Sequence, residues 1–252
     1  MDKAIGKNTD GAVVSIEHLK KSFGKNEVLK DVTFQLQKEE NLVVLGKSGT
    51  GKSVLIKCLV GLVIPDEGTL KVCDENVTEL EGKELNELRA KIGFLFQSGA
   101  LYDSMTVREN LEFPLKRQAG KASQEELDVL VREALDNVGL VEAIDKMPSE
   151  LSGGMRKRVS LARTLILKPE IMLYDEPTTG LDTITSKEIS TLILAIKKKY
   201  RTSSIIITHD MECARMVADR VIILNEGKVI GAGTYDELKN SSTEEIKAFF
   251  ES

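Results

Sequence analysis

The feature that most constrains this chain is a glycine-rich segment between a buried strand and a helix. The apolar residues 42–45 are typical of a central strand, and an apolar helix is predicted from Lys52 to about Leu62. Glycines at suitable spacing let successive backbone N–H groups turn inward around a phosphate chain. The sequence therefore predicts a phosphate-binding loop, or P-loop. It consists of Gly46, Lys47, Ser48, Gly49, Thr50, Gly51, Lys52 and Ser53.

Two side chains of the P-loop carry specific predictions. Lys52 is expected to reach the terminal phosphates of a bound nucleotide, and Ser53 to offer its hydroxyl to Mg²⁺. The helix N-terminus adds positive partial charge at the same point. A P-loop alone leaves kinases, GTPases, helicases and transport ATPases open.

Composition narrows the choice of partners and compartment. The 252 residues contain 35 Lys and Arg against 40 Asp and Glu, with a net charge of -5, which argues against a broad basic surface for nucleic acid. We expect no nucleic-acid partner. Cys58, Cys73 and Cys213 are scattered singly, which indicates reduced thiols in the cytosol. No apolar run approaches the roughly 20 residues that span a bilayer, and residues 1–9 are too polar for a signal peptide.

The order of the apolar segments predicts one α/β domain with a mainly parallel sheet. Strand-like runs alternate with helical segments along the chain; they lie at residues 13–19, 32–36, 42–45, 92–96, 171–174, 204–208 and 221–224. Between residues 97 and 169 the pattern is helical. Ser123 and Glu126 form a capping-box pattern there. The apolar stripe that follows predicts core packing in an inserted helical lobe: Leu127, Leu130, Val131, Ala134, Leu135 and Val138.

An acidic pair follows one of these buried strands. Residues 171–174 deliver Asp175 and Glu176 to the carboxyl end of the strand, where ligands bind in open parallel sheets. Asp175 is expected to hold Mg²⁺, directly or through water, and Glu176 to polarise the water that attacks the γ-phosphate. Pro177 offers the simpler alternative of a strand-ending turn. The P-loop in the same chain favours the functional interpretation.

A second glycine-rich helix start lies at Leu151, Ser152, Gly153, Gly154 and Met155. Ser152 can cap a helix whose first turn exposes glycine N–H groups, which makes a second phosphate-binding helix N-terminus. The P-loop already serves one nucleotide, so the second site is useful only if two chains meet head to tail. The alternative is an ordinary serine-capped helix.

Residues 151–155 resemble the signature of ABC transporter ATPases, which in that family completes the ATP site of the opposite subunit. Further matches follow in the family's order over about residues 13–240. Phe23 corresponds to the aromatic side chain that stacks on adenine, and Gln97 to the glutamine that senses Mg²⁺ and water. His209 corresponds to the histidine that contacts the γ-phosphate.

The resemblance extends to the loop formed by Thr179, Gly180, Leu181 and Asp182, which in the family crosses the dimer interface. The chain departs from the family at Met155, where glutamine is usual, and at Phe23, where tyrosine is more frequent. Stacking on a base uses the face of the ring, so we expect it to survive the second change. The first change leaves the backbone N–H groups of the signature in place.

The resemblance implies a fold and a setting. The fold is that of a RecA-like P-loop NTPase, with a mainly parallel sheet, antiparallel N-terminal strands and an inserted helical subdomain. The ABC ATPase domain would cover residues 11–250, with a core of about residues 11–97 and 168–240 and a helical subdomain of about residues 98–167. The cofactors would be ATP and Mg²⁺. The protein would be a head-to-tail homodimer bound peripherally to the cytoplasmic face of the inner membrane through a permease.

Three segments look most like the Mla-type ATPases, which work with a permease and an MCE-domain protein to move phospholipids. These segments are residues 97–107, 151–158 and 180–185. The resemblance therefore implies phospholipid transport across the cell envelope. Another ABC importer or exporter, an ABC ATPase that does not serve transport, and a P-loop kinase remain as alternatives.

The segment after Gln97 is predicted to dock the permease. It is unusually apolar for a loop, and a rotation of the helical lobe on ATP binding would move it. We expect Leu101, Tyr102 and Met105 to be exposed there. A helix capped by Thr106 should bury Leu111 and Phe113 inside the lobe.

Overall fold

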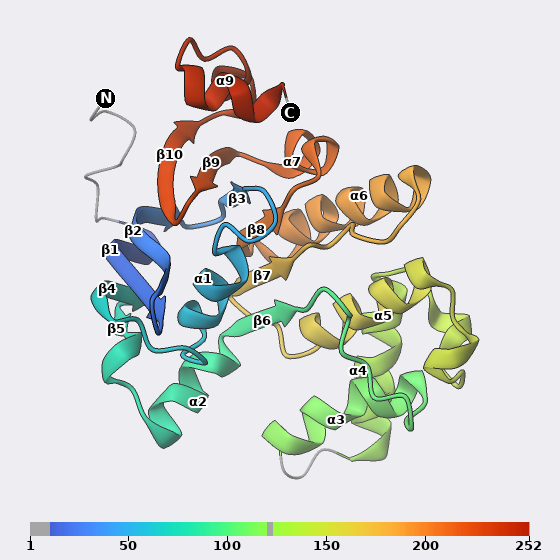
Figure 1. Ribbon diagram of the computed structural model, residues 1–252. Coiled ribbons are helices and arrows are strands. Elements are labelled where there is room, and N and C mark those ends of the chain that lie inside the picture. Colours follow the sequence, from blue (N-terminus) through green and yellow to red (C-terminus); the bar gives the residue numbers. More distant parts are fainter. Residues whose placement is uncertain (1–10, 120–122, 252) are drawn as a thin grey trace.

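The computed structural model describes residues 11–119 and 123–251. Within these residues ten strands form one sheet in the order β5-β4-β1-β2-β10-β9-β3-β8-β7-β6 (Figure 1). The strands are β1 (Ala12–Phe23), β2 (Asn26–Gln37), β3 (Asn41–Leu45), β4 (Glu67–Val72), β5 (Glu75–Asn76), β6 (Ile92–Leu95), β7 (Ile171–Asp175), β8 (Ser203–Thr208), β9 (Arg220–Asn225) and β10 (Lys228–Gly233).

The sheet combines a parallel half with an antiparallel half. β3 pairs in parallel with β8 and β9, and β7 pairs in parallel with β6 and β8. At the other side, β1 pairs antiparallel with β2 and β4, and one parallel pair between Lys228 and Asp31 joins the halves. All five residues of β3 are buried, as expected for a strand covered on both faces. The predicted fold class is confirmed.

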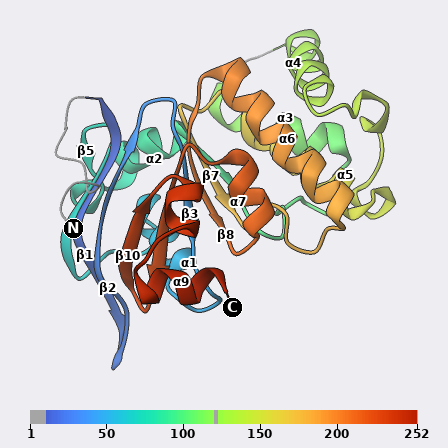
Figure 2. The ribbon, with the colours of Figure 1, turned by 90° about the horizontal axis from the view of Figure 1, so that it is seen from above.

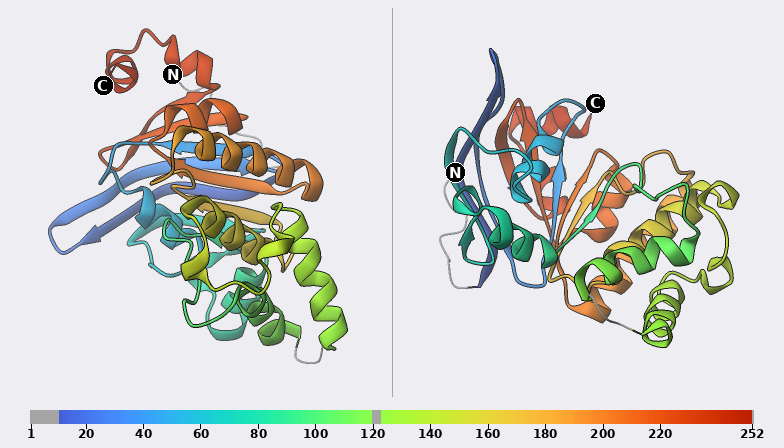
Figure 3. Two further views of the ribbon diagram at one scale, coloured as in Figure 1. Left: turned by 90° about the vertical axis from the view of Figure 1, so that its right-hand side faces the viewer. Right: turned by 90° about the horizontal axis from the view of Figure 1, so that it is seen from below.

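The helices cover the parallel half and build a separate lobe (Figures 2 and 3). They are α1 (Lys52–Leu59), α2 (Gly82–Ala90), α3 (Val107–Ala119), α4 (Gln124–Asp136), α5 (Gly153–Leu165), α6 (Thr183–Tyr200), α7 (Met211–Val217), α8 (Tyr235–Lys239) and α9 (Glu244–Phe250). Short 3-10 turns occur at Val77–Glu79, Val141–Ala143 and Pro148–Glu150. None of the helices in the described part of the chain has the length and apolar composition to cross a bilayer.

The helical lobe has its own core between α3, α4 and α5. The predicted capping box at the start of α4 is confirmed, because Ser123 accepts from the Glu126 N–H while Glu126 accepts from the Ser123 N–H. The predicted stripe faces inward, although Leu130 is only half-buried. The core holds Val107, Leu111, Leu127, Val131, Leu135, Val159 and Ala162 among others.

Helix α1 ends earlier than predicted. Its last residue is Leu59, and Leu62, which was expected within the helix, is 57% exposed. Gly61 takes φ +65°, its N–H donates to the Cys58 carbonyl, and the Leu62 N–H donates to the Lys57 carbonyl. This is the Schellman arrangement in which a left-handed glycine ends a helix. Strand β6 also ends early, at Leu95, so Gln97 lies two residues beyond it.

Candidate nucleotide-binding site

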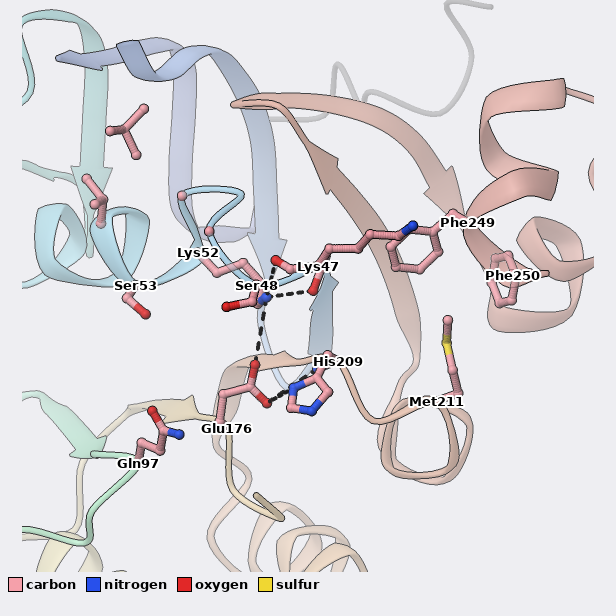
Figure 4. A pocket seen from close by; sticks show the side chains of 15 residues that line it. Lys47, Ser48, Lys52, Ser53, Gln97, Glu176, His209, Met211, Phe249 and Phe250 are labelled. Carbon is pink, nitrogen blue, oxygen red and sulfur yellow. Dashed lines mark hydrogen bonds and ion pairs between the residues drawn. The ribbon is translucent and has the colours of Figure 1, made fainter. Parts of the chain in front are cut away.

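A pocket of about 780 Å³ opens at the carboxyl ends of β3, β7 and β8 (Figure 4). Its volume falls within the roughly 300–1,000 Å³ that is usual for small-molecule sites. The pocket brings together three segments that are far apart in the sequence: the P-loop, the end of β7 and the end of β8. Its lining residues are Val28, Gly46, Lys47, Ser48, Gly49, Gly51, Lys52, Ser53, Val54, Gln97, Glu176, His209, Met211, Phe249 and Phe250.

The P-loop backbone depends on two glycines. Gly51 precedes α1 with φ +103°, a left-handed conformation that side chains disfavour. Gly46 lies so close to β9 that a Cβ atom there would fall 2.7 Å from the Leu224 carbonyl oxygen. In the described structure no side chain caps the first turn of α1. Its N–H groups are therefore available to an anion.

Lys52 points back into the loop. Its Nζ donates to the Gly46 and Lys47 carbonyl oxygens at 2.6 and 3.0 Å and lies 3.7 Å from Glu176 Oε1. Burial lowers the pKa of the Lys52 ammonium, and the carboxylates of Glu176 and Asp175 oppose that shift. The loop thus holds a buried cation at the N-terminus of α1, where an anion can bind.

Glu176 forms the other wall of the pocket. Its Oε2 lies 2.8 Å from His209 Nδ1 and accepts from the His209 N–H at 3.3 Å and from Thr179 Oγ1 at 3.2 Å. The Glu176 side chain is nearly buried, whereas the His209 ring is 61% exposed. Glu176 also has φ +50°, a strained conformation that clusters at functional sites. Two distant strand ends therefore fix one carboxylate within reach of both Lys52 and His209.

Asp175 fits a cation ligand. It ends β7, and among the described residues its buried Oδ1 has no hydrogen-bond partner. Burial and the neighbouring Glu176 raise the pKa of Asp175. A buried carboxylate oxygen without a partner is costly unless a cation or a donor meets it. Ser53, which lines the pocket, provides the hydroxyl that would share Mg²⁺ with it.

Comparison with known proteins identifies the family. Residues 29–179 match the family profile described as ABC transporter. The chain belongs to the ABC transporter family. It is an ATP-hydrolysing subunit of such a transporter.

Several curated relatives align over nearly the whole chain. The probable ribonucleotide transport ATP-binding protein mkl of Mycobacterium leprae is 39% identical over 97% of this chain and 70% of its own length; for the Mycobacterium tuberculosis protein the chain covers 66%. Trigalactosyldiacylglycerol 3 of Arabidopsis thaliana is 37% identical over 96% of this chain and 74% of its own length. The methionine import protein MetN of Campylobacter jejuni is 36% identical over 94% of this chain and 75% of its own length.

Solved ABC structures share the fold. The ATP-binding cassette MJ0796, seen as a dimer after hydrolysis with ADP and Pi, has a TM-score of 0.80 and 31% identity over 88% of this chain and 98% of that chain. CbiO1 of Clostridium perfringens, part of the ABC transporter complex cbiONQ, has a TM-score of 0.84 and 27% identity over 96% of this chain and 100% of that chain. Members of the ABC family thus form dimers and assemble with further transporter subunits.

The signature residues lie outside the pocket of their own chain. Ser152 caps α5 by accepting from the Met155 N–H at 3.3 Å, as predicted. A Cβ atom on Gly154 would fall 2.5 Å from Thr185 Cγ2, so the signature packs against the start of α6. Asp182 caps α6 by accepting from the Ile184 and Thr185 N–H groups at 3.0 Å. The signature and the loop at residues 179–182 therefore form one surface.

Phe23 is placed at the tip of the β1–β2 hairpin rather than in the pocket wall. Its side chain is 50% exposed, and Lys21 Nζ lies 5.4 Å from the centre of its ring. The tip of the hairpin carries the ring outside the set of residues that line the pocket.

The sequence analysis missed five residues of the pocket: Val28, Val54, Met211, Phe249 and Phe250. Phe249 and Phe250 end α9, and in Figure 4 the side chain of Lys47 extends toward Phe249. The paired aromatic residues near the end of the chain were the available signal. Their approach to the P-loop depends on how α8 and α9 pack on the sheet, where Phe249 joins the core with Leu238 and Ile246.

Proposed function

We propose that Lys52 binds the terminal phosphates of ATP and that Glu176 polarises the attacking water. The observation that supports this most is the convergence of Lys52, Glu176 and His209 in one pocket at the N-terminus of α1. His209 holds Glu176 in place and turns its exposed ring edge toward the γ-phosphate. Gln97, on the far wall, orients the same water.

Mg²⁺ would be held by Ser53, Asp175 and Gln97. Bound there, it would neutralise charge on the β- and γ-phosphate oxygens. The supporting observation is the partnerless buried oxygen of Asp175. The adenine would stack on Phe23, beyond the phosphate end of the pocket.

We further propose that two copies of the chain complete each other's sites. At the N-terminus of α5, Ser152 and Gly153 are exposed, Gly154 is half-buried, and none of them lines the pocket of its own chain. A head-to-tail dimer would bring it onto the phosphates held by the second copy, with Asp182 and its loop at the interface. Each bound ATP would then contact both copies and stabilise the dimer.

A permease would dock on the loop that follows Gln97, although the exposed surface differs from the one predicted. Tyr102 is 43% exposed, but Leu101 and Met105 are half-buried and Leu101 packs against the helical core. Leu111 is buried as predicted, whereas Phe113 is 36% exposed, and its ring lies 5.0 Å from that of Tyr102. The apolar patch is therefore formed by Tyr102 and Phe113, with Leu101 and Met105 beneath it.

Asn110 makes this loop rigid. Its side-chain amide donates to the Tyr102, Met105 and Thr106 carbonyl oxygens at 3.0–3.1 Å, and its Oδ1 accepts from the Tyr102 N–H at 2.8 Å. Thr106 caps α3 with Glu109, as the sequence predicted. A preordered loop loses little entropy on binding, which suits a docking surface.

The substrate that we favour is phospholipid, moved with a permease and an MCE-domain protein at the cytoplasmic face of the inner membrane. The support is the resemblance of residues 97–107 and 151–158 to Mla-type ATPases, and a relative named for trigalactosyldiacylglycerol, a lipid. Relatives named for ribonucleotide transport and methionine import provide the alternative substrates.

Reconstitution with the permease in vesicles tests this proposal. The complex should move a fluorescent phospholipid between vesicle populations only when ATP is present, and Glu176→Gln should abolish the movement. If methionine or a ribonucleotide stimulated hydrolysis and no lipid moved, that solute and not phospholipid would be the substrate.

The docking patch is tested by Tyr102→Asp with Val129→Asp as the matched control. Val129 lies on α4 of the same lobe and is 65% exposed. A charge in the centre of an interface is strongly unfavourable, so Tyr102→Asp should abolish co-purification with the permease while ATP binding by the chain stays unchanged. Equal loss of the permease in both variants would contradict the location of the patch.

A further inference from the structure

Three side chains of α5 hold the segment that contains Gln97. Lys157 Nζ donates to the Gln97 carbonyl oxygen at 2.6 Å, and Arg163 Nη1 donates to the Ala100 carbonyl oxygen at 2.5 Å. Between them, Ser160 lies against Gly99. We call Lys157, Ser160 and Arg163 the α5 clamp. Their spacing of three residues places them along one side of the helix, so they can follow an extended segment.

The segment is shaped to approach α5 closely. Gly99 has φ +79°, and a Cβ atom there would fall 2.5 Å from Ser160 Oγ. Ala100 also has a left-handed φ of +51°. These two residues turn the chain so that the carbonyl groups of Gln97 and Ala100 both face the helix. The Arg163 guanidinium further lies 5.5 Å from the centre of the Tyr102 ring.

Lys157 is the buried end of the clamp. Only 5% of the residue is exposed, and its long side chain ends on a main-chain carbonyl. Burial lowers the pKa of the Lys157 ammonium, and the carboxylates of Asp175 and Glu176 oppose that shift. The ammonium group therefore lies at the main chain of Gln97, within electrostatic reach of the acidic pair at the end of β7.

Gln97 lies at the junction between the sheet and the helical lobe. On one side, β6 is fixed to β7 by pairs that end with Leu95 opposite Tyr174. On the other side, the Gln97 and Ala100 carbonyl oxygens accept hydrogen bonds from side chains of α5. Phe96, 38% exposed, lies between the two anchored parts.

We propose that Lys157 is a positioning residue that makes Gln97 move with α5, so that docking of the α5 N-terminus on a second copy sets the place of Gln97 in its own pocket. The inference rests on the role proposed above for Gln97. Through Arg163 the same clamp carries Tyr102, so the permease surface and Gln97 move as one body.

The test is Lys157→Met in the full chain. Methionine fills much of the lysine volume but donates no hydrogen bond. The kcat for ATP should fall roughly 10- to 100-fold, as misplaced groups cost in other enzymes, while the KM for ATP stays within about twofold because Gln97 is not a main binding group. Lys157→Gln, whose amide can donate to the same carbonyl, should recover most of the kcat.

Arg158→Met is the matched control. It removes a cation from the same helix, but Arg158 pairs with Glu188 on α6 instead of holding residues 97–100. Its kcat should remain near that of the unmodified chain. If Lys157→Met does not fold, Arg163→Met breaks the outer end of the clamp and should show the same fall in kcat at unchanged KM, though a smaller one.

A double-mutant cycle with Gln97→Ala separates this inference from the proposed function. If Lys157 acts through Gln97, Lys157→Met should have little further effect in the Gln97→Ala background. An equal fall in both backgrounds, or failure of Lys157→Gln to recover kcat, would overturn the inference. A normal kcat in Gln97→Ala alone would instead overturn the role proposed for Gln97.

Discussion

The chain contains two glycine-rich helix N-termini that resemble each other in sequence and differ in their surroundings. The N-terminus of α1 follows Gly51 in a left-handed conformation and opens into a pocket that holds Lys52 and Glu176. The N-terminus of α5 is capped by Ser152 and lies on the exposed surface, packed against α6. Among the described residues, Lys52, Glu176 and His209 gather around the first N-terminus and not around the second.

The difference shows why one copy of the chain is insufficient under our proposal. α1 provides a site where a phosphate chain can bind and react, whereas α5 provides N–H donors with no pocket of their own. The two N-termini are complementary, because a phosphate held by α1 offers α5 the anion that it lacks. The predictions below test the N-terminus of α1 and the N-terminus of α5 separately.

The largest effect is expected for Glu176→Gln, which changes the α1 site alone. Loss of the carboxylate should lower ATP hydrolysis by roughly 100-fold or more, since a positioned base contributes on that scale. ATP binding should remain, and an ATP-bound dimer should accumulate, as measured by phosphate release and size-exclusion chromatography. Unchanged steady-state turnover would contradict the role of Glu176.

A different kind of loss is expected for Lys52→Ala. Removing the buried ammonium should weaken nucleotide binding roughly 10- to 100-fold, because a hydrogen bond to a charged group contributes about 1.5–3 kcal/mol. Isothermal titration with ATP measures this. Lys57→Ala is the matched control, because Lys57 is an exposed lysine on the same helix. Equal affinities for the two variants would remove Lys52 from the phosphate site.

The smallest effect concerns the cap of α5. Ser152→Ala and Ser123→Ala each remove one side-chain bond to a helix N-terminus, at 3.3 and 3.2 Å. Each loss should cost about 1 kcal/mol of folding stability, which lowers Tm by roughly 2–4 °C in a chain of this size. Only Ser152→Ala should also lower ATP hydrolysis. Equal hydrolysis in both variants would reduce Ser152 to a helix cap.

The elements around the α1 site were predictable because their signals are local. A short apolar run, a glycine-rich turn and a helix follow one another within residues 42–59, and Asp175 and Glu176 directly follow their strand. The same holds for the capping box at Ser123 and for the helix cap at Thr106. In each case neighbouring residues determine the structure.

Features that depend on distant packing were not predictable. Phe249 reaches the P-loop because α9 packs on the sheet beside β10, and the ring of Phe113 on α3 meets that of Tyr102 from the preceding loop. The close contact of Gly154 with Thr185 likewise joins two helices that separate parts of the chain provide. The contact of Lys157 with Gln97 could not be predicted from the sequence, because the acceptor is a main-chain carbonyl oxygen and no particular residue type is needed there.

The central claim is that α1 of one copy and α5 of the other share one nucleotide, and an obligate mixed dimer tests it most directly. One chain carries Lys52→Ala and the other Ser152→Arg. Under the head-to-tail arrangement both substitutions fall on the same site and the second site stays whole. The mixed dimer should therefore bind one ATP tightly and hydrolyse it. A homodimer of the Lys52→Ala chain and a homodimer of the Ser152→Arg chain should not, because each has lost both sites. Loss of both ATP sites in the mixed dimer would contradict the account.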